Sequence, residues 1–342
     1  MKKVAVVILN WNGESLLEKF IPPLIKYTDN NLADIFVADN ASSDSSISLL
    51  KNNFPEINII QHPVNYGFAE GYNKSIAQIE YNYIVLLNSD VEVSENWLPP
   101  LIRELDKSKN TACVVPKILD HKNREYFEYA GAAGGFIDKY GYPFCRGRIF
   151  ESLEKDKGQY NESSEIFWAS GACLCIRRKD YIDLQGLDKD FFAHMEEIDL
   201  CWRIHKAGKE IRYVADSKVY HVGGGTLDAL SPFKTYLNFR NNLYLLTKNL
   251  PGKLIFSTIF IRLVLDGIAG VRFLFQGKIR FVFSIIKAHF SFYASIPSLK
   301  RKRKNIIPGN IDNYKHLIFQ KSIISEYFLK NKKHFSDINM NL

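Results

Sequence analysis

The 342-residue chain is poor in cysteine, and its five cysteines form no metal-binding pattern. None of them stands in a CxxC pair, so neither a disulfide scaffold nor a thiolate zinc site is expected. Cys173 and Cys175 would share one face of a strand, where buried free thiols are more common than metal ligands. A reducing compartment fits this cysteine content best.

The sequence also lacks the features of a secreted protein. The apolar run at residues 4–9 follows two lysines but is too short for a signal peptide, and polar residues follow it at once. The composition, with 46% hydrophobic and 24% charged residues, is that of a folded protein. We therefore expect the N-terminal part of the chain to be cytoplasmic.

Negative charge is scarce in the last third of the chain. The formal net charge is +8, and residues 251–342 hold 16 Lys and Arg against four Asp and Glu. Aromatic residues precede the basic cluster at residues 300–304 instead of interleaving with it, so nucleic acid is not an expected partner. The change in charge predicts a boundary near residue 250.

What the chain does have is a regular alternation of short β-branched runs and helical segments. Strands are expected at residues 4–9, 35–38, 57–61 and 83–87, with a helix at residues 14–26 after the first of them. This pattern predicts an α/β fold with a Rossmann-like, mostly parallel sheet flanked by helices. Ligands of such sheets bind outside the carboxyl ends of the strands.

Two carboxylates stand at these strand ends. Asp39 could accept hydrogen bonds from a base or a ribose, or it could cap the following helix. Asp90 suits a hard divalent cation that bridges two phosphates, or it could be an ordinary turn residue. His221 could join such a metal site, although a lone histidine at a strand end is more often structural. Gly223–Gly225 would allow the backbone to approach a ligand, or would form a flexible link.

A third acidic group, Glu196 and Glu197 with Asp199, opens a predicted helix at residues 196–206. Adjacent acids point about 100° apart on a helix, so one can bind a substrate while the other acts as a base. Acidic residues also favour the first helical turn for electrostatic reasons alone.

Taken together and in this order, the segments resemble inverting glycosyltransferases of family 2, which have the GT-A fold. The resemblance is closest to the bacterial rhamnosyltransferase-like branch and extends from Val4 to about Asn249. The segments that carry it are residues 6–13, 37–44, 65–73, 87–90, 168–172, 191–203 and 220–221.

The resemblance implies a role for each of these segments. The donor nucleotide would bind to Asn10, Trp11, Asp39, Asn65, Gly67 and Asn88. A manganese or magnesium ion would be held by Asp90 and His221. The sugar and the acceptor would contact Trp168, Ser170, Gly171, Ala172 and Glu196. Glu197 would be the catalytic base that deprotonates the acceptor.

Two positions depart from the family pattern. Asn88 replaces the first acid of the Asp-x-Asp metal motif, which leaves one metal carboxylate. The usual Glu-Asp pair is Glu196-Glu197, so the base falls on a glutamate, and Glu196 and Asp199 remain alternatives to Glu197.

The implied activity is inverting transfer of rhamnose or another hexose from a dTDP- or UDP-sugar to a lipid-linked or polysaccharide acceptor. The alternative is a nucleotide-sugar-binding protein of the same fold without turnover. A nucleotidyltransferase is less consistent with the sequence, because residues 10–13 provide no glycine-rich, basic loop after the first strand.

The C-terminal third contains two apolar segments, residues 254–275 and 281–296, each interrupted by charged residues. A central charge costs roughly 2.5–3.5 kcal/mol on membrane-insertion scales, so spanning helices are not expected.

We expect residues 1–250 to form the GT-A domain, 251–300 an amphipathic helical segment and 301–342 a basic C-terminal tail. This region would lie peripherally on the anionic inner face of the cell membrane. Packing on the core, or in a homodimer, is the alternative.

Overall fold

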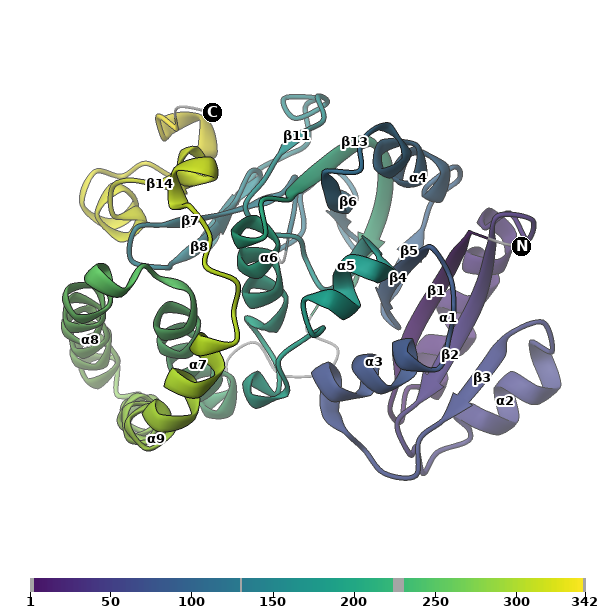
Figure 1. Cartoon of the computed structure of the whole chain (residues 1–342), viewed down its shortest axis with the longest axis horizontal. Coiled ribbons are helices and arrows are strands. Elements are labelled where there is room, and N and C mark those ends of the chain that lie inside the picture. The colour runs from purple at the N-terminus through teal and green to yellow at the C-terminus, as the bar shows by residue number, and fades with distance from the viewer. Residues whose placement is uncertain (1–2, 130, 224–230, 341–342) are drawn as a thin grey trace.

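The fold is built on one large mixed sheet, seen in Figure 1 in a computed structural model that describes residues 3–129, 131–223 and 231–340. Its strands are β1 (Val4–Asn10), β2 (Ala33–Asp39), β3 (Asn58–Gln61), β4 (Tyr83–Asn88), β5 (Val91–Val93), β6 (Thr111–Asp120), β11 (Ser164–Glu165), β12 (Cys173–Arg177) and β13 (Glu210–His221). They lie in the order β11-β13-β6-β12-β4-β1-β2-β3, and β5 pairs with β13.

The N-terminal half of this sheet is parallel, as predicted. β1 pairs in parallel with both β2 and β4, and β2 with β3. β12 runs antiparallel between β4 and β6, which makes the sheet mixed. The carboxyl ends of β1, β2 and β4 therefore share one edge, where the polar residues of the sequence motifs lie.

Helices lie on both faces of the sheet, and the last three of them pack on one another beside it (Figure 1). They are α1 (Glu14–Tyr27), α2 (Ser46–Asn53), α3 (Gly67–Ala77), α4 (Leu98–Lys107), α5 (Arg178–Asp183), α6 (Glu196–Lys206), α7 (Pro232–Asn249), α8 (Gly252–Phe275) and α9 (Ile279–Lys304). In β1, Val4 and Val6 pack with α1 and α4, whereas Ala5 and Val7 pack with α3 on the opposite face. Burial on both faces explains why β1 is a continuous apolar run.

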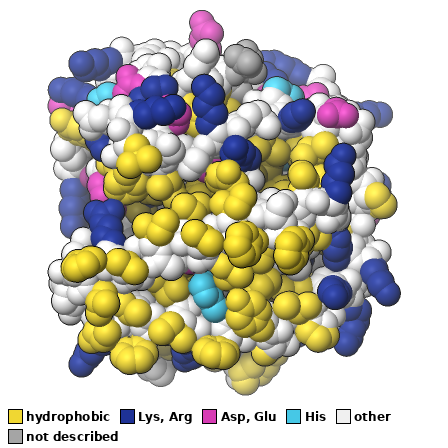
Figure 2. Space-filling view, turned by 90° about the vertical axis from the view of Figure 1, so that its left-hand side faces the viewer, with side chains coloured by type: hydrophobic (Ala, Val, Ile, Leu, Met, Phe, Trp, Pro, Cys, Tyr) yellow, Lys and Arg dark blue, Asp and Glu magenta, His cyan; other side chains and the backbone are white. Residues whose placement is uncertain are grey.

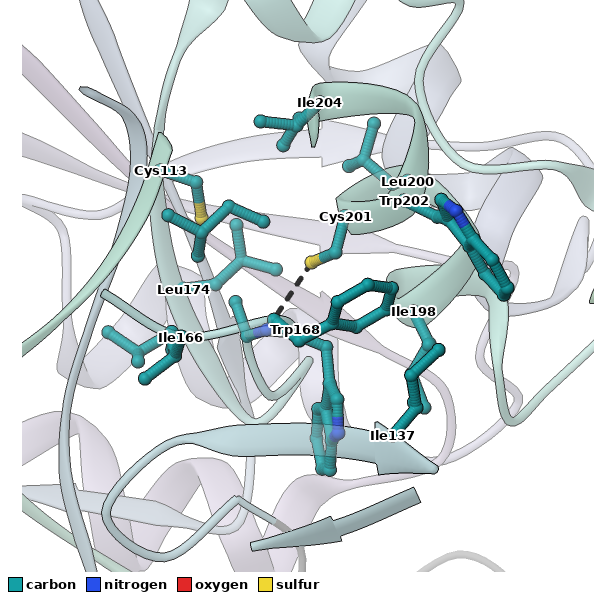
Figure 3. Packing of buried hydrophobic residues seen from close by; sticks show 14 of the residues in the cluster. Cys113, Ile137, Ile166, Trp168, Leu174, Ile198, Leu200, Cys201, Trp202 and Ile204 are labelled. Atoms are coloured by element: carbon teal, nitrogen blue, oxygen red, sulfur yellow. Dashed lines mark hydrogen bonds between the residues drawn. The ribbon is translucent and has the colours of Figure 1, made fainter. Parts of the chain in front are cut away.

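Helix α6 packs on the core through its buried apolar side chains, including those of Ile198, Leu200 and Cys201 (Figure 3). The Cys201 thiol accepts a hydrogen bond from the Ala169 backbone amide at 3.3 Å. Acidic residues in the first turn of α6 and basic residues in its last turn complement the helix dipole. The beginning of α6 is thereby fixed relative to the segment before β12.

A smaller sheet packs beside this core. Its strands are β7 (Gly135–Asp138), β8 (Pro143–Cys145), β9 (Arg148–Ile149), β10 (Ser152–Leu153) and β14 (Ile318–Phe319). β14 comes from the C-terminal region and pairs in parallel with β7. The backbone amide of Ile323 donates to the Asp138 carboxylate at 2.9 Å, and that of Phe335 donates to Glu154 at 3.0 Å.

The C-terminal residues are therefore part of the folded core rather than the separate basic tail expected from residue 301. The basic cluster at residues 300–304 forms the end of α9, and some of its side chains bind partners within the protein. Lys302 forms ion pairs with Asp188 and Asp190, and Arg303 donates to the backbone carbonyls of Thr247 and Lys248. The run of basic residues in the sequence gave no sign of these partners.

Replacing Phe335 with alanine tests whether the C-terminal segment stabilises the domain. The ring is buried, with its centroid 5.3 Å from that of Phe136 and 6.2 Å from that of Phe144. We expect Phe335→Ala to lower the free energy of unfolding by about 3 kcal/mol, because the deletion leaves a cavity. Urea denaturation measures this change.

The matched control is Leu329→Ala in the same segment, whose side chain is exposed. Its effect should stay within about 0.5 kcal/mol. Equal, small effects of both substitutions would mean that the segment is not part of the cooperative fold.

Candidate active site

The ends of β1 and β2 bring Asn10 and Asp39 together. The Asn10 side-chain amide donates to Asp39 Oδ1 at 3.0 Å and to Ser42 Oγ at 3.2 Å, and the Ser42 backbone amide donates to Asp39 Oδ2 at 3.0 Å. Both carboxylate oxygens of Asp39 are thus held in place, and the contact with Ser42 shows the turn role that the sequence left open. Trp11, next to this pair, has half of its surface exposed.

The start of α3 forms the second part of this site. Asn65 Oδ1 accepts hydrogen bonds from the Gly67 backbone amide at 2.8 Å and from the Asn40 side chain at 2.9 Å. Gly67 has a φ of 74°, which favours glycine at this first residue of the helix. Asn40 was not among the predicted site residues, although its position directly after Asp39 at a strand end could have indicated a role in the site. It ties the strand end to the helix start.

Antiparallel pairing of β5 with β13 brings Asp90 to His221 across 131 residues of sequence. His221 Nε2 lies 3.1 Å from Asp90 Oδ1, and His221 Nδ1 lies 3.2 Å from Glu128 Oε1. Burial favours the neutral imidazole, but the hydrogen bonds to the two carboxylates outweigh it and raise the pKa of His221 to about 10. Glu128 was not predicted, because it lies outside every recognisable motif.

Asp90 and His221 carry oxygen and nitrogen atoms of the kind that bind a divalent cation once the imidazole loses its proton, but Glu128 is not placed to be a third ligand. It contacts the opposite nitrogen of the imidazole ring from Asp90. Accordingly, no three His, Cys, Asp or Glu side chains in the described part of the chain form a metal-binding group. Of the glycines after His221, Gly223 has a φ of 68°, and Gly224 and Gly225 lie outside the described residues.

The segment before β12 joins these strand ends to α6. The Asn88 backbone amide donates to the Ala172 carbonyl at 2.9 Å, so the end of β4 lies beside this segment. A Cβ atom placed on Gly171 would be 3.9 Å from Glu197 Cβ. The predicted positions 88, 171, 172 and 197 are therefore neighbours.

Glu197 and Glu196 are the unpaired acids of the site. Burial raises the pKa of Glu197 to about 7 and that of Glu196 well above its usual value, with the charge of Glu197 adding to the shift at Glu196. The Oε2 atom of each is buried and has no hydrogen-bond partner among residues 3–129, 131–223 and 231–340. Both carboxyls are therefore shifted toward the protonated form, and the pKa of Glu197 lies where this group can exchange a proton near neutral pH.

Asp199 has a different environment on the same helix. It accepts hydrogen bonds from Arg203 Nε at 2.9 Å, Lys248 Nζ at 2.9 Å and Asn249 Nδ2 at 2.8 Å. Burial alone would raise the pKa of Asp199, but the charges of Lys248 and Arg203 outweigh it and lower the pKa. The group is an ionised link between α6 and α7, with no capacity left for a substrate.

Two predicted acceptor-side residues are turned away from the pocket. Trp168 is buried, its indole donates to the Phe136 carbonyl at 2.9 Å, and Gly135 lies against its ring (Figure 3). Its side chain is part of the core between the two sheets, which corrects the expectation that it forms the floor of the site. Ser170 is also buried, and its hydroxyl accepts from the Ala172 amide at 3.2 Å.

The loop that leads into α6 has a strained backbone. Phe192, His194 and Met195 have φ angles of 68°, 69° and 75°, in a region that residues with side chains rarely adopt. The Asn241 side-chain amide, on α7, donates to the carbonyls of Phe191, Ala193 and His194 at 2.7–2.9 Å. Asn241 holds this strained loop, and with it the position of Glu196 and Glu197.

Comparison with known proteins agrees with this arrangement. The model of glycosyl transferase family 2 matches residues 5–184, which is just over half of the chain. The chain belongs to glycosyl transferase family 2. Within this family it is rhamnosyltransferase-like, as the resemblance in the sequence predicted.

This family 2 glycosyltransferase is similar to an N-acetylglucosaminyl-diphospho-decaprenol L-rhamnosyltransferase of Mycobacterium tuberculosis. The two are 23% identical over 230 residues, which cover 63% of this chain and 75% of the relative. It is also 22% identical over 225 residues to the rhamnosyltransferase WbbL of Escherichia coli, covering 64% of this chain and 83% of WbbL.

The fold is GT-A, as in the solved structures of related glycosyltransferases. A crystal structure of GalNAc-T7 with UDP, GalNAc and Mn2+ superimposes with a TM-score of 0.57 and 18% identity. The superposition covers 72% of this glycosyltransferase and 48% of the GalNAc-T7 chain, so this chain spans about half the length of that protein.

Asn241→Ala tests whether the strained loop must be held for the glycosyltransferase to act. We expect kcat to fall by about a hundredfold, because small displacements of catalytic groups have effects of this size. The measurement is sugar transfer or donor hydrolysis. The control is Asn242→Ala, since buried Asn242 donates to the Gly141 carbonyl of the smaller sheet instead. Asn242→Ala should lower the melting temperature but leave kcat within about threefold, and equal losses of kcat would rule out the positioning role.

Proposed function

We propose that the chain is an inverting glycosyltransferase that moves a sugar, rhamnose or another hexose, from a dTDP- or UDP-linked donor. The acceptor is a hydroxyl group on a lipid-linked or polysaccharide substrate in cell-surface glycan synthesis. The observation that carries the proposal is Glu197, a half-buried carboxyl with a pKa near 7. It lies against Gly171, in the segment that also contacts the β4 end leading to Asp90.

In the proposed reaction, Glu197 accepts the proton of the acceptor hydroxyl as its oxygen attacks the anomeric carbon of the donor. The bond between that carbon and the diphosphate oxygen breaks on the opposite face, so the anomeric configuration inverts. No covalent bond to the protein is needed. A base with a pKa of about 7 is well matched to this task, because half of it is ionised at neutral pH.

Asp90 and His221 would hold Mn2+ or Mg2+ in this proposal. Their oxygen and nitrogen donors are 3.1 Å apart and buried, and the related GalNAc-T7 structure contains Mn2+ with UDP. When bound, the cation would neutralise negative charge on the departing diphosphate. Asn88 would contact the donor as a neutral group in place of the usual first acid.

The donor nucleotide would lie over the ends of β1 and β2. Asp39, fixed by Asn10 and Ser42, would accept hydrogen bonds from the base, and exposed Trp11 would line the pocket. Asn65 and Gly67 would border it at the start of α3. Gly171 and Ala172, with Glu196 beside them, would face the sugar.

Separate substitutions distinguish the two glutamates of α6, and a third substitution tests the metal site at Asp90. We expect Glu197→Gln to lower transfer about a thousandfold, since a general base contributes roughly 10²–10⁴-fold. Glu196→Gln should retain most activity, because burial and the charge of Glu197 raise the pKa of Glu196 and favour its neutral form, which glutamine resembles. Asp90→Ala should abolish metal-dependent transfer. Assays with a panel of dTDP- and UDP-sugars in manganese measure all three variants.

The pH profile gives an independent check on the base. Because Glu197 must be ionised to accept a proton, kcat/KM should fall tenfold per pH unit below about 7 and level off above it. Full turnover by Glu197→Gln would contradict the base assignment. Donor binding without hydrolysis or transfer by the wild-type protein would instead identify a nucleotide-sugar-binding protein.

The exposed face of α8 and α9 supports a peripheral location on the membrane. Both helices are long and apolar enough to span a bilayer by length and composition, which alone is weak evidence because core helices share this property. Arg262 and Asp266 are buried on the inner side, where Asp266 pairs with Arg262 at 3.0 Å and with His289 at 3.2 Å. The guanidinium of Arg262 also stacks on the ring of Tyr142 in the smaller sheet.

The outward face carries no carboxylate, since buried Asp266 is the only acid of α8 and α9, although Arg272 and Lys287 are exposed on these helices. Its exposed apolar side chains are Phe256, Phe260, Val264, Ile268, Val271, Leu274, Phe275, Ile279, Phe283, Ile286 and Phe290. Figure 2 shows hydrophobic side chains gathered on this side of the molecule, with Lys and Arg around the margins. We propose that this membrane face lies on an anionic bilayer at the cytoplasmic side.

Vesicle binding tests the membrane face. Phe260→Asp with Ile268→Asp should weaken co-flotation with phosphatidylglycerol vesicles at least tenfold, because both substitutions place a charge on the apolar surface that the membrane would bury. The control Ile182→Asp changes an exposed residue of α5 and should have no effect. Release by high salt is expected for peripheral binding, whereas retention through salt and carbonate would indicate insertion. Unchanged flotation together with a halved native mass would identify a dimer interface instead.

A further inference from the structure

A row of aromatic rings joins the candidate active site to the membrane face. The ring centroids of Phe192 and Phe233 are 6.0 Å apart, and those of Phe233 and Tyr236 are 6.1 Å apart. Phe192 is 51% exposed and Phe233 45%, although large aromatic side chains are normally buried. Phe192 belongs to the strained loop before α6, and the other two rings belong to the first two turns of α7.

One end of this row borders the active site. A Cβ atom on Gly67 would be 3.7 Å from the Phe192 ring, which places the ring at the edge of the proposed donor pocket. Phe192 also precedes Glu196 and Glu197 by only a few residues, in the loop that Asn241 holds.

The other end of the row reaches the membrane face on α9. The hydroxyl of Tyr236 lies 2.9 Å from the Ser291 hydroxyl, and Lys287 Nζ lies 5.1 Å from the centroid of the Tyr236 ring. Lys287 is exposed and stands between Phe283 and Phe290, which both belong to the exposed apolar face.

Two cations flank Tyr236 at this end. The guanidinium of Arg240 lies 5.2 Å from the ring centroid, on α7, and Lys287 approaches from α9. Arg240 donates to the backbone carbonyls of Asp190 and Phe191 and to the Tyr236 hydroxyl, and neither cation forms an ion pair with a carboxylate in the described part of the chain. Cations without carboxylate partners beside an apolar face are a favourable environment for a phosphate group.

We propose that Phe192, Phe233 and Tyr236, with Arg240 and Lys287, form an acceptor track that binds a lipid diphosphate carrying a sugar. The lipid chain lies along the membrane face of α8 and α9, and the diphosphate binds between the two cations. The attached sugar stacks its apolar C–H face on Phe233 and Phe192 and points toward Glu197. The acceptor part of this inference rests on the proposed glycosyltransferase activity.

The first test measures binding without any donor or metal. Farnesyl diphosphate in detergent micelles with EDTA is the probe, and farnesol is its uncharged counterpart. We expect farnesyl diphosphate to bind more tightly than farnesol, and Lys287→Glu to weaken its binding about tenfold by calorimetry. The control is Lys278→Glu, the same charge change at an exposed lysine next to the same helix.

Two outcomes of this test would overturn the track. Equal weakening by Lys278→Glu would show general attraction to a basic surface, and equal affinity for farnesol and farnesyl diphosphate would show that no diphosphate site exists. If the diphosphate binds in the donor pocket instead, Lys287→Glu will leave its affinity unchanged, and this result would also overturn the proposal.

The second test separates the track from the proposed function. Phe233→Ala should raise KM for a sugar linked to a lipid diphosphate about tenfold, with a much smaller change in KM for the donor. An unchanged KM would contradict the role of the aromatic row. If the wild-type protein neither hydrolyses nor transfers any donor sugar, the proposed function fails, while the binding test of the track still stands because it contains no donor.

Discussion

The buried ion pairs of Asp199 with Arg203 and Lys248 are the interaction on which the rest of the site depends. They fix the first turn of α6 against α7, and Lys248 continues the connection to Asp188, which also pairs with Lys302 at the end of α9. Removing one partner of such a pair leaves an uncompensated buried charge and typically costs about 3–5 kcal/mol. The same charges therefore hold the helix that carries the acids and the helix that carries the membrane face.

Around this fixed point, three acids within four residues have three different environments. Cations around Asp199 lower its pKa, burial beside another carboxyl raises the pKa of Glu196, and Glu197 has a pKa of about 7. Helix propensity and dipole preference treat these residues alike, so only tertiary neighbours can separate them. A carboxyl kept unpaired in a buried position is unfavourable for stability, and such sites are typical of positions selected for chemistry.

These tertiary environments explain why the sequence predicted only part of the fold and of the site. The strands were predictable because a β-branched run buried on both faces has no other good explanation, and polar residues at their ends marked the edge where Asn10, Asp39 and Asn88 meet. The pairing of Asp90 with His221 followed from the family resemblance, since no local pattern connects residues so far apart.

Glu128 and Asn241 could not be predicted, because their importance comes entirely from which distant backbone or side chain they contact. The inward pairing of Asp266 with Arg262 and His289 was equally invisible, and it reverses what the interrupted apolar segments suggest about the surface.

Helix α7 connects these features physically. Its buried side carries Asn241 and Lys248, which hold the loop and the first turn of α6, and its exposed side carries Phe233 and Tyr236, which face the solvent between the site and α9. Contacts of α7 with α9, such as that of Tyr236 with Ser291, fix the height of the catalytic acids above the membrane face. An acceptor anchored in the bilayer has its reactive hydroxyl at a set distance from its lipid chain, whereas a soluble acceptor does not. In the proposed arrangement, rigid attachment of the site to the membrane face would select acceptors by the length of the polar group between lipid and hydroxyl, with the sugar stacked on Phe233 and Phe192.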